Sequence, residues 1–317
     1  MIEVIESGLL TLIQDGGRTG YQAWGVTVGG AVDRFSLNIG NLLVGNHPDA
    51  PGIEMNMTGA VFRAQELLIA TLTGADFSAE LDGKKIPLGT VFSWPKGSLL
   101  SMKGQPEGAR GYLTVSGAID VPCVLNSAAT DLIAGIGGIS GRALQKGDKL
   151  NTGKKRMDPS FLLGRRLPPV LIRKKKEKKA EKVRVIWGPH DDAFTQKGKD
   201  AFTSTIYECS HRMNRMGLQC LGKPVEHIRG ADILSIGVTF GSIQVPADGQ
   251  PFILLADRQT TGGYTQIATV IRADFQKIAQ LMPGDRIQFC PVSLHEAREA
   301  LLEQVRILKQ LSIHNRK

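Results

Sequence analysis

Short stretches of alternating apolar and polar residues run along most of this chain, and glycine-rich and proline-rich turns separate them. Val183–Trp187 alternates in this way, whereas the segments 67–72, 112–115 and 252–255 are almost continuously apolar. Turn residues recur about every 8–12 positions, which is typical of β-sandwiches and barrels rather than of a doubly wound sheet. The pattern predicts a mainly β protein with a few helices.

Four segments carry helix signals instead. Asp33 can cap a helix that ends at Gly45, and Asp191 or Asp192 can cap a second one. A third is expected around 275–281, before a Pro-Gly stop, and a capping box at 293–296 begins the last. The apolar positions of this last helix have helical spacing, which predicts packing in a core or against a partner: Leu294, Ala297, Leu301, Leu308 and Leu311.

The 317 residues are long enough for about two domains. We expect an N-terminal domain at 1–150, a basic linker region at 151–183, a second domain at 184–290 and a helical tail at 291–317. Both predicted domains end in a Gly-Asp turn followed by a strand, at 147–150 and at 284–287. This shared ending hints at two related domains.

The net charge of +9 is confined to one part of the chain. Residues 152–184 contain 13 Lys or Arg and 3 acidic residues, so this segment carries +10 and the remainder −1. A solvated linker explains such a run, and an arm that binds an acidic partner is the alternative. No aromatic residue interrupts 173–179, so bases would have no stacking platform there, and we expect no nucleic-acid partner.

Other classes of protein find little support in the sequence. It has no run of about 18 apolar residues, so we expect no membrane span, and its acidic, alternating N-terminus does not resemble a signal peptide. The four scattered cysteines predict reduced thiols in a cytoplasmic protein. P-loop, dinucleotide-binding and nucleophile-elbow patterns are missing, and the six histidines lack metal-ligand spacing, so we expect no metal.

Three polar clusters in glycine-rich turns remain as candidates for substrate binding. In the first, Gln14, Asp15 and Arg18 could bind a small polar molecule, or an Asp15–Arg18 pair could order the loop. In the second, Asn214 and Arg215 offer an amide and a guanidinium fork for a carboxylate or carbonyl, or form a simple polar turn.

The third cluster follows an apolar strand and leads into a Gly-Gly turn, where a rigid scaffold can present binding groups. Arg258 can hold an anion, and Asp257 could orient Arg258 or accept a proton from the substrate, so both are candidate catalytic residues. A structural polar turn is the alternative. The remaining members are candidate substrate-binding residues: Gln259, Thr260, Thr261, Gly262, Gly263 and Tyr264.

In this order, the three clusters resemble the biotin-dependent carboxyltransferases related to allophanate hydrolase subunit 2, a family that includes Kip antagonists, also described as C subunits of 5-oxoprolinase. The matching residues include 8–15, 17–18, Asn41–Asn46, Glu54, 74–76, 117–122, Asn214–Gly217, 241–246, 249–251 and Asp257–Tyr264. The resemblance covers residues 2 to about 290. It implies two cyclophilin-like β-barrel domains in tandem.

The resemblance also implies a function in a complex. With a Kip inhibitor-like B subunit and a further A subunit, such a chain takes part in ATP-dependent cleavage of 5-oxoproline to L-glutamate. ATP is then required by the complex, at a site that the residues do not assign to one polypeptide. One alternative is a carboxyltransferase component that acts on urea or another amide and requires biotin. The non-enzymatic alternative is a regulator that sequesters a kinase inhibitor.

Two positions depart from the family pattern. Ile236 stands where relatives often carry an acidic residue, and His190 stands where glutamine is expected. If the acidic residue takes part in the chemistry, its replacement puts the activity in question.

Overall fold

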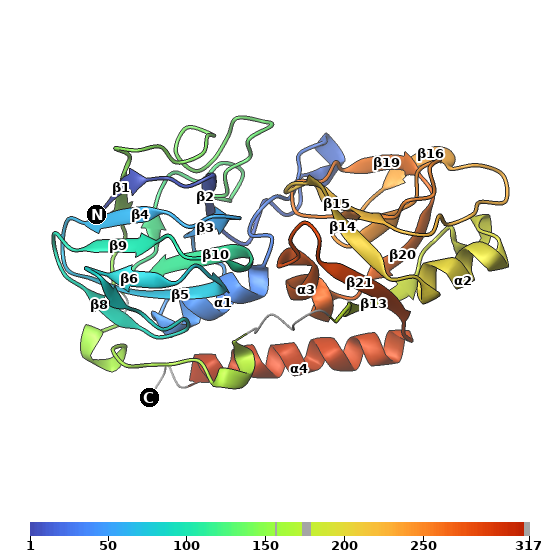
Figure 1. The fold of residues 1–317 in the computed structure, drawn as a ribbon. Coiled ribbons are helices and arrows are strands. Elements are labelled where there is room, and N and C mark those ends of the chain that lie inside the picture. Colours follow the sequence, from blue (N-terminus) through green and yellow to red (C-terminus); the bar gives the residue numbers. More distant parts are fainter. Residues whose placement is uncertain (156, 173–178, 314–317) are drawn as a thin grey trace. The chain divides into compact units, whose positions relative to one another are not determined.

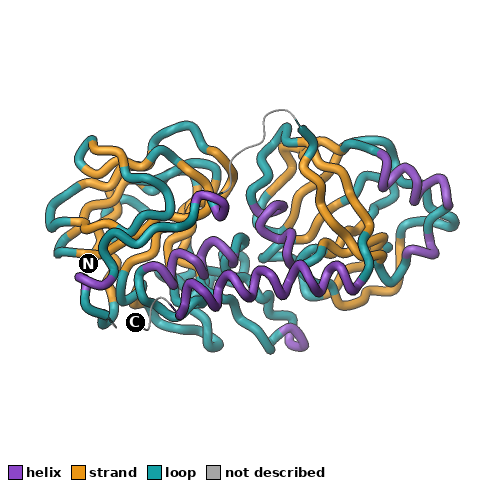
Figure 2. Tube along the Cα trace, turned by 90° about the horizontal axis from the view of Figure 1, so that it is seen from below, coloured by secondary structure: helices purple, strands orange, loops and turns teal. Residues whose placement is uncertain are grey.

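The computed structural model describes residues 1–155, 157–172 and 179–313, and they form two compact units. Unit 1 comprises the described residues within Met1–Thr19, Gly29–Lys175 and Ile307–Lys317, and unit 2 those within Gly20–Val28 and Lys176–Arg306. Strands dominate both units, as Figure 2 shows in orange, and the mainly β prediction is confirmed. Much of the basic run at 173–179 lies outside the described residues.

Unit 1 contains two antiparallel sheets rather than one closed barrel (Figure 1). In sheet order, the seven-stranded sheet consists of β11 (Ile119–Asp120), β12 (Lys149–Thr152), β1 (Ile2–Glu6), β4 (Val61–Ala64), β9 (Leu99–Met102), β6 (Ala79–Leu81) and β7 (Lys84–Lys85). The five-stranded sheet consists of β2 (Leu10–Gln14), β3 (Gly52–Asn56), β10 (Glu107–Val115), β5 (Leu68–Asp76) and β8 (Phe92–Trp94). Both sheets contribute to one apolar core, from Ile2 and Phe62 to Ile53 and Leu113.

Helix α1 (Arg34–Leu43) packs against β5 and β10. As predicted, Asp33 caps it: its Oδ1 accepts a hydrogen bond from the Ser36 N–H at 3.0 Å. The segment before the helix is held by the buried carboxylate of Glu54, which accepts hydrogen bonds from the Val32 N–H at 3.0 Å and the Tyr112 hydroxyl at 2.7 Å. Tyr112 in turn accepts from the Asp33 N–H at 2.8 Å.

The first part of the predicted linker belongs to unit 1. Leu162 and Leu167 are buried in a small core with Leu43 and Val44 of the α1 region, near the short 3-10 helices η2 (Pro159–Phe161) and η3 (Pro169–Leu171). The expectation of a solvated linker is therefore wrong for this part, because apolar residues between the basic ones bind it to α1.

Unit 2 is a closed barrel with the strand order β13 (Glu181–Trp187), β20 (Gln266–Val270), β17 (Ser242–Gln244), β18 (Phe252–Leu254), β15 (Gly217–Leu221), β14 (Tyr207–Met213) and β21 (Arg286–Pro291). The parallel pair of β13 and β21 closes it. Outside the barrel, β16 (Asp232–Gly237) and β19 (Thr261–Tyr264) form a separate two-stranded ribbon. The segment 20–28, which includes the 3-10 helix η1 (Gln22–Trp24), groups with this unit and not with the predicted N-terminal domain.

Three helices accompany the barrel. Thr195, and not Asp191 or Asp192, caps α2 (Gln196–Ser204), because the two aspartates lie in the 3-10 helix η4 (Asp191–Ala193). The 3-10 helix η5 (Arg272–Asp274) leads into α3 (Phe275–Ala279). The predicted capping box begins α4 (Leu294–Ile313), where Ser293 and Glu296 bond to each other's backbone N–H. In unit 1, Leu308 and Leu311 of α4 pack on the Leu43–Val44 core, which confirms core packing for these two positions.

Candidate functional site

A buried ion pair joins the second and third polar clusters at the end of β18. The Arg215 guanidinium donates from Nε to Asp257 Oδ2 at 2.8 Å and from Nη2 to Asp257 Oδ1 at 2.9 Å. The backbones also meet, because the Asp257 N–H donates to the Arg215 carbonyl at 2.9 Å. Both side chains are almost fully buried. This bidentate pair occupies both carboxylate oxygens of Asp257, so the geometry favours a positioning role for this residue over proton transfer.

The neighbouring Asn214 also has a local role. Its side-chain oxygen accepts hydrogen bonds from the N–H groups of Met216 at 2.8 Å and Gly217 at 3.2 Å, which is an Asx turn. Asn214 therefore stabilises the turn that places Arg215 beside Asp257.

Next to the Arg215–Asp257 pair, Arg258 is the charged group that remains available for a ligand. Its Nε donates to the Val238 carbonyl at 3.4 Å and its Nη1 to the Leu255 carbonyl at 3.1 Å. Within the described ranges, no carboxylate forms an ion pair with Arg258 and no group accepts a hydrogen bond from its Nη2. Burial lowers the pKa of the Arg258 guanidinium from its usual range, while the charge of Asp257 opposes that shift. A half-buried guanidinium in such a setting can bind a carboxylate or phosphate oxygen.

From Arg258 the chain continues into β19, one of the two strands of the ribbon. The Thr260 carbonyl accepts from the Val238 N–H at 3.1 Å, and Gly262 pairs with Ile236 across the ribbon. A Cβ atom on Gly262 would lie 2.5 Å from Gln244 Nε2, so a larger residue there would displace the Gln244 side chain. Gln259, Thr260 and Gly263 are half-buried, and Thr261 and Tyr264 are exposed. Gly262 and Gly263 therefore lie in strand β19 and not in the predicted turn, and the apolar Ile236 lies opposite Gly262 in the ribbon.

Two buried glutamines next to this ribbon were not among the predicted site residues. Gln244 and Gln266 are paired between β17 and β20, and each is 3% exposed. Gln244 Nε2 donates to the Tyr264 carbonyl at 3.4 Å, and Gln266 Nε2 has no partner among the described residues. Gln244 alternates with Ile243 and Val245, as a solvent-facing residue of a strand would, so no local signal in the sequence marks it as buried.

Two histidines flank the start of β20. His190 Nδ1 accepts a hydrogen bond from the Gln266 N–H at 3.2 Å. His227 Nε2 lies 3.1 Å from the Val245 carbonyl and 3.0 Å from Thr265 Oγ1. Burial lowers the pKa of His227, although the bond to Val245 acts in the opposite direction. Both rings therefore form hydrogen bonds within unit 2.

The first cluster lies in unit 1, where its side chains hold a loop at 124–130. Gln14 Nε2 donates to the Thr130 carbonyl at 3.0 Å. Asp15 accepts from the Ser127 hydroxyl at 2.7 Å and the Ala128 N–H at 2.6 Å. Arg18 donates to the carbonyls of Val124 and Ala129, and no Asp15–Arg18 ion pair forms between these described residues. All three are buried, so the geometry favours loop positioning over direct contact with a substrate.

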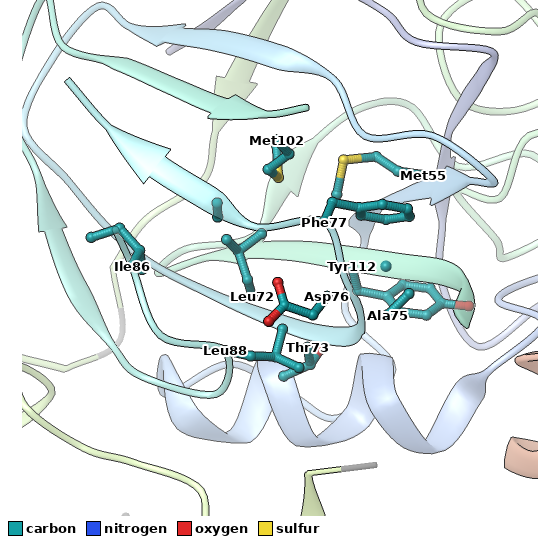
Figure 3. A pocket seen from close by; sticks show the side chains of 12 residues that line it. Met55, Leu72, Thr73, Ala75, Asp76, Phe77, Ile86, Leu88, Met102 and Tyr112 are labelled. Atoms are coloured by element: carbon teal, nitrogen blue, oxygen red, sulfur yellow. The ribbon is translucent and has the colours of Figure 1, made fainter. Parts of the chain in front are cut away.

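A small cavity in unit 1 does not offer an alternative site (Figure 3). Leu72, Ile86 and Met102 contribute to its largely apolar lining, with the Asp76 carboxylate at one side. The space open to the centre of a water-sized sphere is about 10 Å³, which is enough for about one water molecule. A substrate of the size of an amino acid would not fit.

The described part of the chain lacks two further kinds of feature. It contains no group of three or more His, Cys, Asp and Glu side chains placed to hold a metal ion. It also contains no helix long and apolar enough to cross a membrane.

The sequence model of the carboxyltransferase domain, subdomains A and B, matches residues 24–291 of this chain. The chain belongs to this carboxyltransferase family. The predicted resemblance is thereby confirmed, and the family match covers both units.

The relatives of this chain include a 5-oxoprolinase subunit and urea amidolyases. The C subunit of 5-oxoprolinase from Escherichia coli is 37% identical over 317 residues, which cover 99% of each chain. The urea amidolyase of Saccharomyces cerevisiae is 32% identical over 98% of this chain but only 18% of its own length. Among solved structures, the urea amidolyase of K. lactis matches with a TM-score of 0.91 and 28% identity, over 98% of this chain and 20% of that one.

Proposed function

We propose that this chain is the C subunit of an ATP-dependent 5-oxoprolinase and acts with partner polypeptides, the A and B subunits, to convert 5-oxoproline to L-glutamate. The observation that carries the proposal is the end-to-end match to a 5-oxoprolinase C subunit, at 37% identity over 99% of both chains. The match to urea amidolyase covers only 18% of that protein.

The chemistry of the candidate site suits this substrate. The molecule 5-oxoproline combines a carboxylate with a stable lactam, so a site must bind the carboxylate and orient the carbonyl for activation. Arg258 can bind the carboxylate as a bidentate partner, because Val238 and Leu255 hold its guanidinium in place. The buried Arg215–Asp257 pair fixes the backbone that carries Arg258.

ATP enters the proposal as a reactant of the complex. Transfer of its terminal phosphoryl group to the lactam oxygen would turn that oxygen into a good leaving group. Water would then add to the ring carbon, and the ring C–N bond would break with protonation of the nitrogen to give glutamyl phosphate. A second water molecule would hydrolyse this acyl phosphate to L-glutamate and inorganic phosphate. We assign no residue of this chain to ATP.

Carboxyl transfer from biotin is the second candidate function, and the TM-score of 0.91 to a urea amidolyase structure favours it. The two candidates differ in their cofactor. A carboxyltransferase would need biotin on another polypeptide and would stop working when avidin is added, whereas a 5-oxoprolinase would not.

Reconstitution tests the proposal. The chain is mixed with purified A and B subunits from the same organism, and glutamate and ADP are measured after addition of 5-oxoproline and ATP. We expect glutamate only when all three chains and ATP are present, with no effect of avidin. Activity of the isolated chain, absence of glutamate from the complete mixture, or an avidin-sensitive reaction with urea would contradict the proposal.

A further inference from the structure

Gln244 of β17 and Gln266 of β20 are a buried pair of uncharged polar side chains in unit 2. The two residues are cross-strand partners, and each is 3% exposed. From Ile243 and Ala268 to this glutamine pair, β17 advances by one residue and β20 by two, so Ile267 is an additional residue. Such a β-bulge changes the direction of neighbouring side chains and is frequent at barrel rims and beside binding sites. The pair therefore lies at an irregular point of the barrel wall.

The carboxamides of this pair lack good hydrogen-bond partners. Gln266 Nε2 is buried without an acceptor, and no described residue bonds to the Gln266 side chain. Gln244 Nε2 reaches the Tyr264 carbonyl only at 3.4 Å, which is a weak bond. A carboxamide has both N–H donors and an acceptor oxygen, and buried polar groups of folded proteins are almost always bonded. The pair thus has donors and acceptors left for a molecule that is not part of this chain.

The surroundings of Gln266 are held in place by other bonds. Its N–H donates to His190 Nδ1 at 3.2 Å, and its carbonyl accepts from the His190 N–H at 3.3 Å. His227 Nε2 lies 3.0 Å from Thr265 Oγ1 and 3.1 Å from the Val245 carbonyl. These neighbouring polar groups bond to one another or to the backbone, whereas the Gln266 carboxamide does not. A group on such a fixed backbone loses little conformational entropy when it binds a ligand.

The Gln244 carboxamide lies close to the segment that holds Arg258. A Cβ atom on Gly262 would lie 2.5 Å from Gln244 Nε2 and 3.2 Å from Val238 Cγ1, so both side chains approach the same point of the ribbon. The Val238 carbonyl in turn accepts a hydrogen bond from Arg258 Nε at 3.4 Å. Among the described strands, those of the ribbon pair only with each other, so the ribbon can move without breaking the barrel (Figure 1).

The ligand that matches the glutamine pair is a small uncharged amide whose N–H and C=O lie on the same side, as they do in a lactam ring. One carboxamide can donate from Nε2 to the lactam oxygen and accept the lactam N–H at Oε1, which gives two parallel hydrogen bonds. A charged group is a poor match, because the pair offers no opposite charge to offset its burial. A site that bonds to an N–H also rejects an analogue that lacks it.

We propose that Gln266, assisted by Gln244, binds the lactam group of the substrate while Arg258 binds its carboxylate, an inference that rests on the proposed function. The carboxamide of Gln266 then selects a lactam over a lactone of the same shape. Both glutamines belong to unit 2 of this chain, so the chain alone should bind a lactam without ATP or other subunits.

The test follows the side-chain amide signals of Gln244 and Gln266 by NMR in the isotope-labelled full chain, with the variants Gln266→Met and Gln244→Met used to assign them. The probe is 2-pyrrolidinone, a lactam without a carboxylate, and γ-butyrolactone is the analogue without an N–H. We expect the Gln266 signal to shift saturably with 2-pyrrolidinone and about tenfold or more weaker binding of γ-butyrolactone. Gln266→Met should weaken binding of 2-pyrrolidinone about tenfold or more, as followed by the Gln244 signal.

Gln280→Met is the matched control, because Gln280 is also 3% exposed but lies at the end of α3, and this variant should bind 2-pyrrolidinone like wild type. If Gln266→Met fails to fold, Gln266→Glu has nearly the same shape and removes the same amide signal. The comparison of the two probes on the wild-type chain requires no variant for binding.

Absence of a saturable shift would overturn the proposal, and so would equal binding of the lactam and the lactone, which would leave water as the partner of Gln266. Wild-type binding of 2-pyrrolidinone by Gln266→Met would also overturn it. Glutamate release by the three wild-type polypeptides reports separately on the proposed function, so the two failures are distinguishable.

Discussion

Arg215 and Asp257 are 42 residues apart in sequence and form a bidentate ion pair inside unit 2. This pair links the turn before β15 to the segment after β18, and it fixes the backbone next to Arg258. Because Arg215 occupies both oxygens of the Asp257 carboxylate, Asp257 does not neutralise the neighbouring Arg258.

Asp257→Asn should destabilise unit 2 strongly. The substitution leaves the Arg215 charge buried without its partner, and loss of one member of such a pair costs about 3–5 kcal/mol. Urea unfolding measures the change. Glu303→Gln is the control, because Glu303 pairs with Arg306 on an exposed helix face and should contribute less than about 1 kcal/mol. Equal stability of Asp257→Asn and wild type would contradict this role.

Tyr112→Phe tests the polar network in unit 1. Removal of the hydroxyl leaves the Asp33 N–H and a carboxylate oxygen of Glu54 without this bond, at a cost of about 1–3 kcal/mol. Burial raises the pKa of Tyr112 well above its usual value, with the negative charges of Glu54 and Asp33 adding to this, so the group stays neutral and can donate. Tyr264→Phe, at an exposed tyrosine, should leave the free energy of unfolding almost unchanged, and a comparable loss there would refute the argument.

Local signals in the sequence predicted much of this fold. The caps at Asp33 and at Ser293–Glu296 were correct because each involves residues within one turn of helix. Strands such as β13 were predicted because alternation reflects burial on one side. The assignment of the cap of α2 failed, since Thr195 and the two aspartates before it carry equivalent local signals.

Such local signals do not predict contacts between residues that are far apart in the sequence. Nothing local to Arg215 reveals that its partner is Asp257, and nothing local to Arg18 reveals the loop at 124–129. Both arginines were predicted to bind substrate because an arginine in a glycine-rich turn has the same appearance whether it binds a ligand or the chain's own backbone.

The acid sensitivity of unit 2 should depend on Asp274. Burial would raise the pKa of this carboxyl, but hydrogen bonds from the Arg184 side chain and backbone, together with Lys277, outweigh it and lower the pKa. A lowered pKa in the folded state means that the unfolded state binds more protons, so the stabilisation is present above about pH 4 and is lost as the pH falls further. Asp274→Asn should be less stable than wild type at pH 7, and the difference in urea unfolding should shrink progressively as the pH falls below about 4. A constant difference across this range would contradict the assignment.

Arg258→Lys separates substrate binding from structural support. The lysine keeps the charge but loses the planar fork, so kcat/KM of the reconstituted complex should fall about tenfold or more, equivalent to about 1.4 kcal/mol. Thermal stability and binding to the B subunit should change little. Arg286→Lys, at an exposed arginine of β21, is the control. A lower melting temperature with unchanged activity per folded molecule would show that Arg258 only orders the loop.

The most direct measurement is the initial rate of glutamate formation from 5-oxoproline and ATP as this chain is titrated into fixed amounts of the A and B subunits. The account predicts no reaction without the chain and a rate that rises to a plateau at a fixed ratio of the three polypeptides. Arg258→Lys should reach its plateau at the same ratio but at a rate lower by about tenfold or more. A rate of glutamate formation that does not depend on the chain would contradict its assignment as a component of a 5-oxoprolinase.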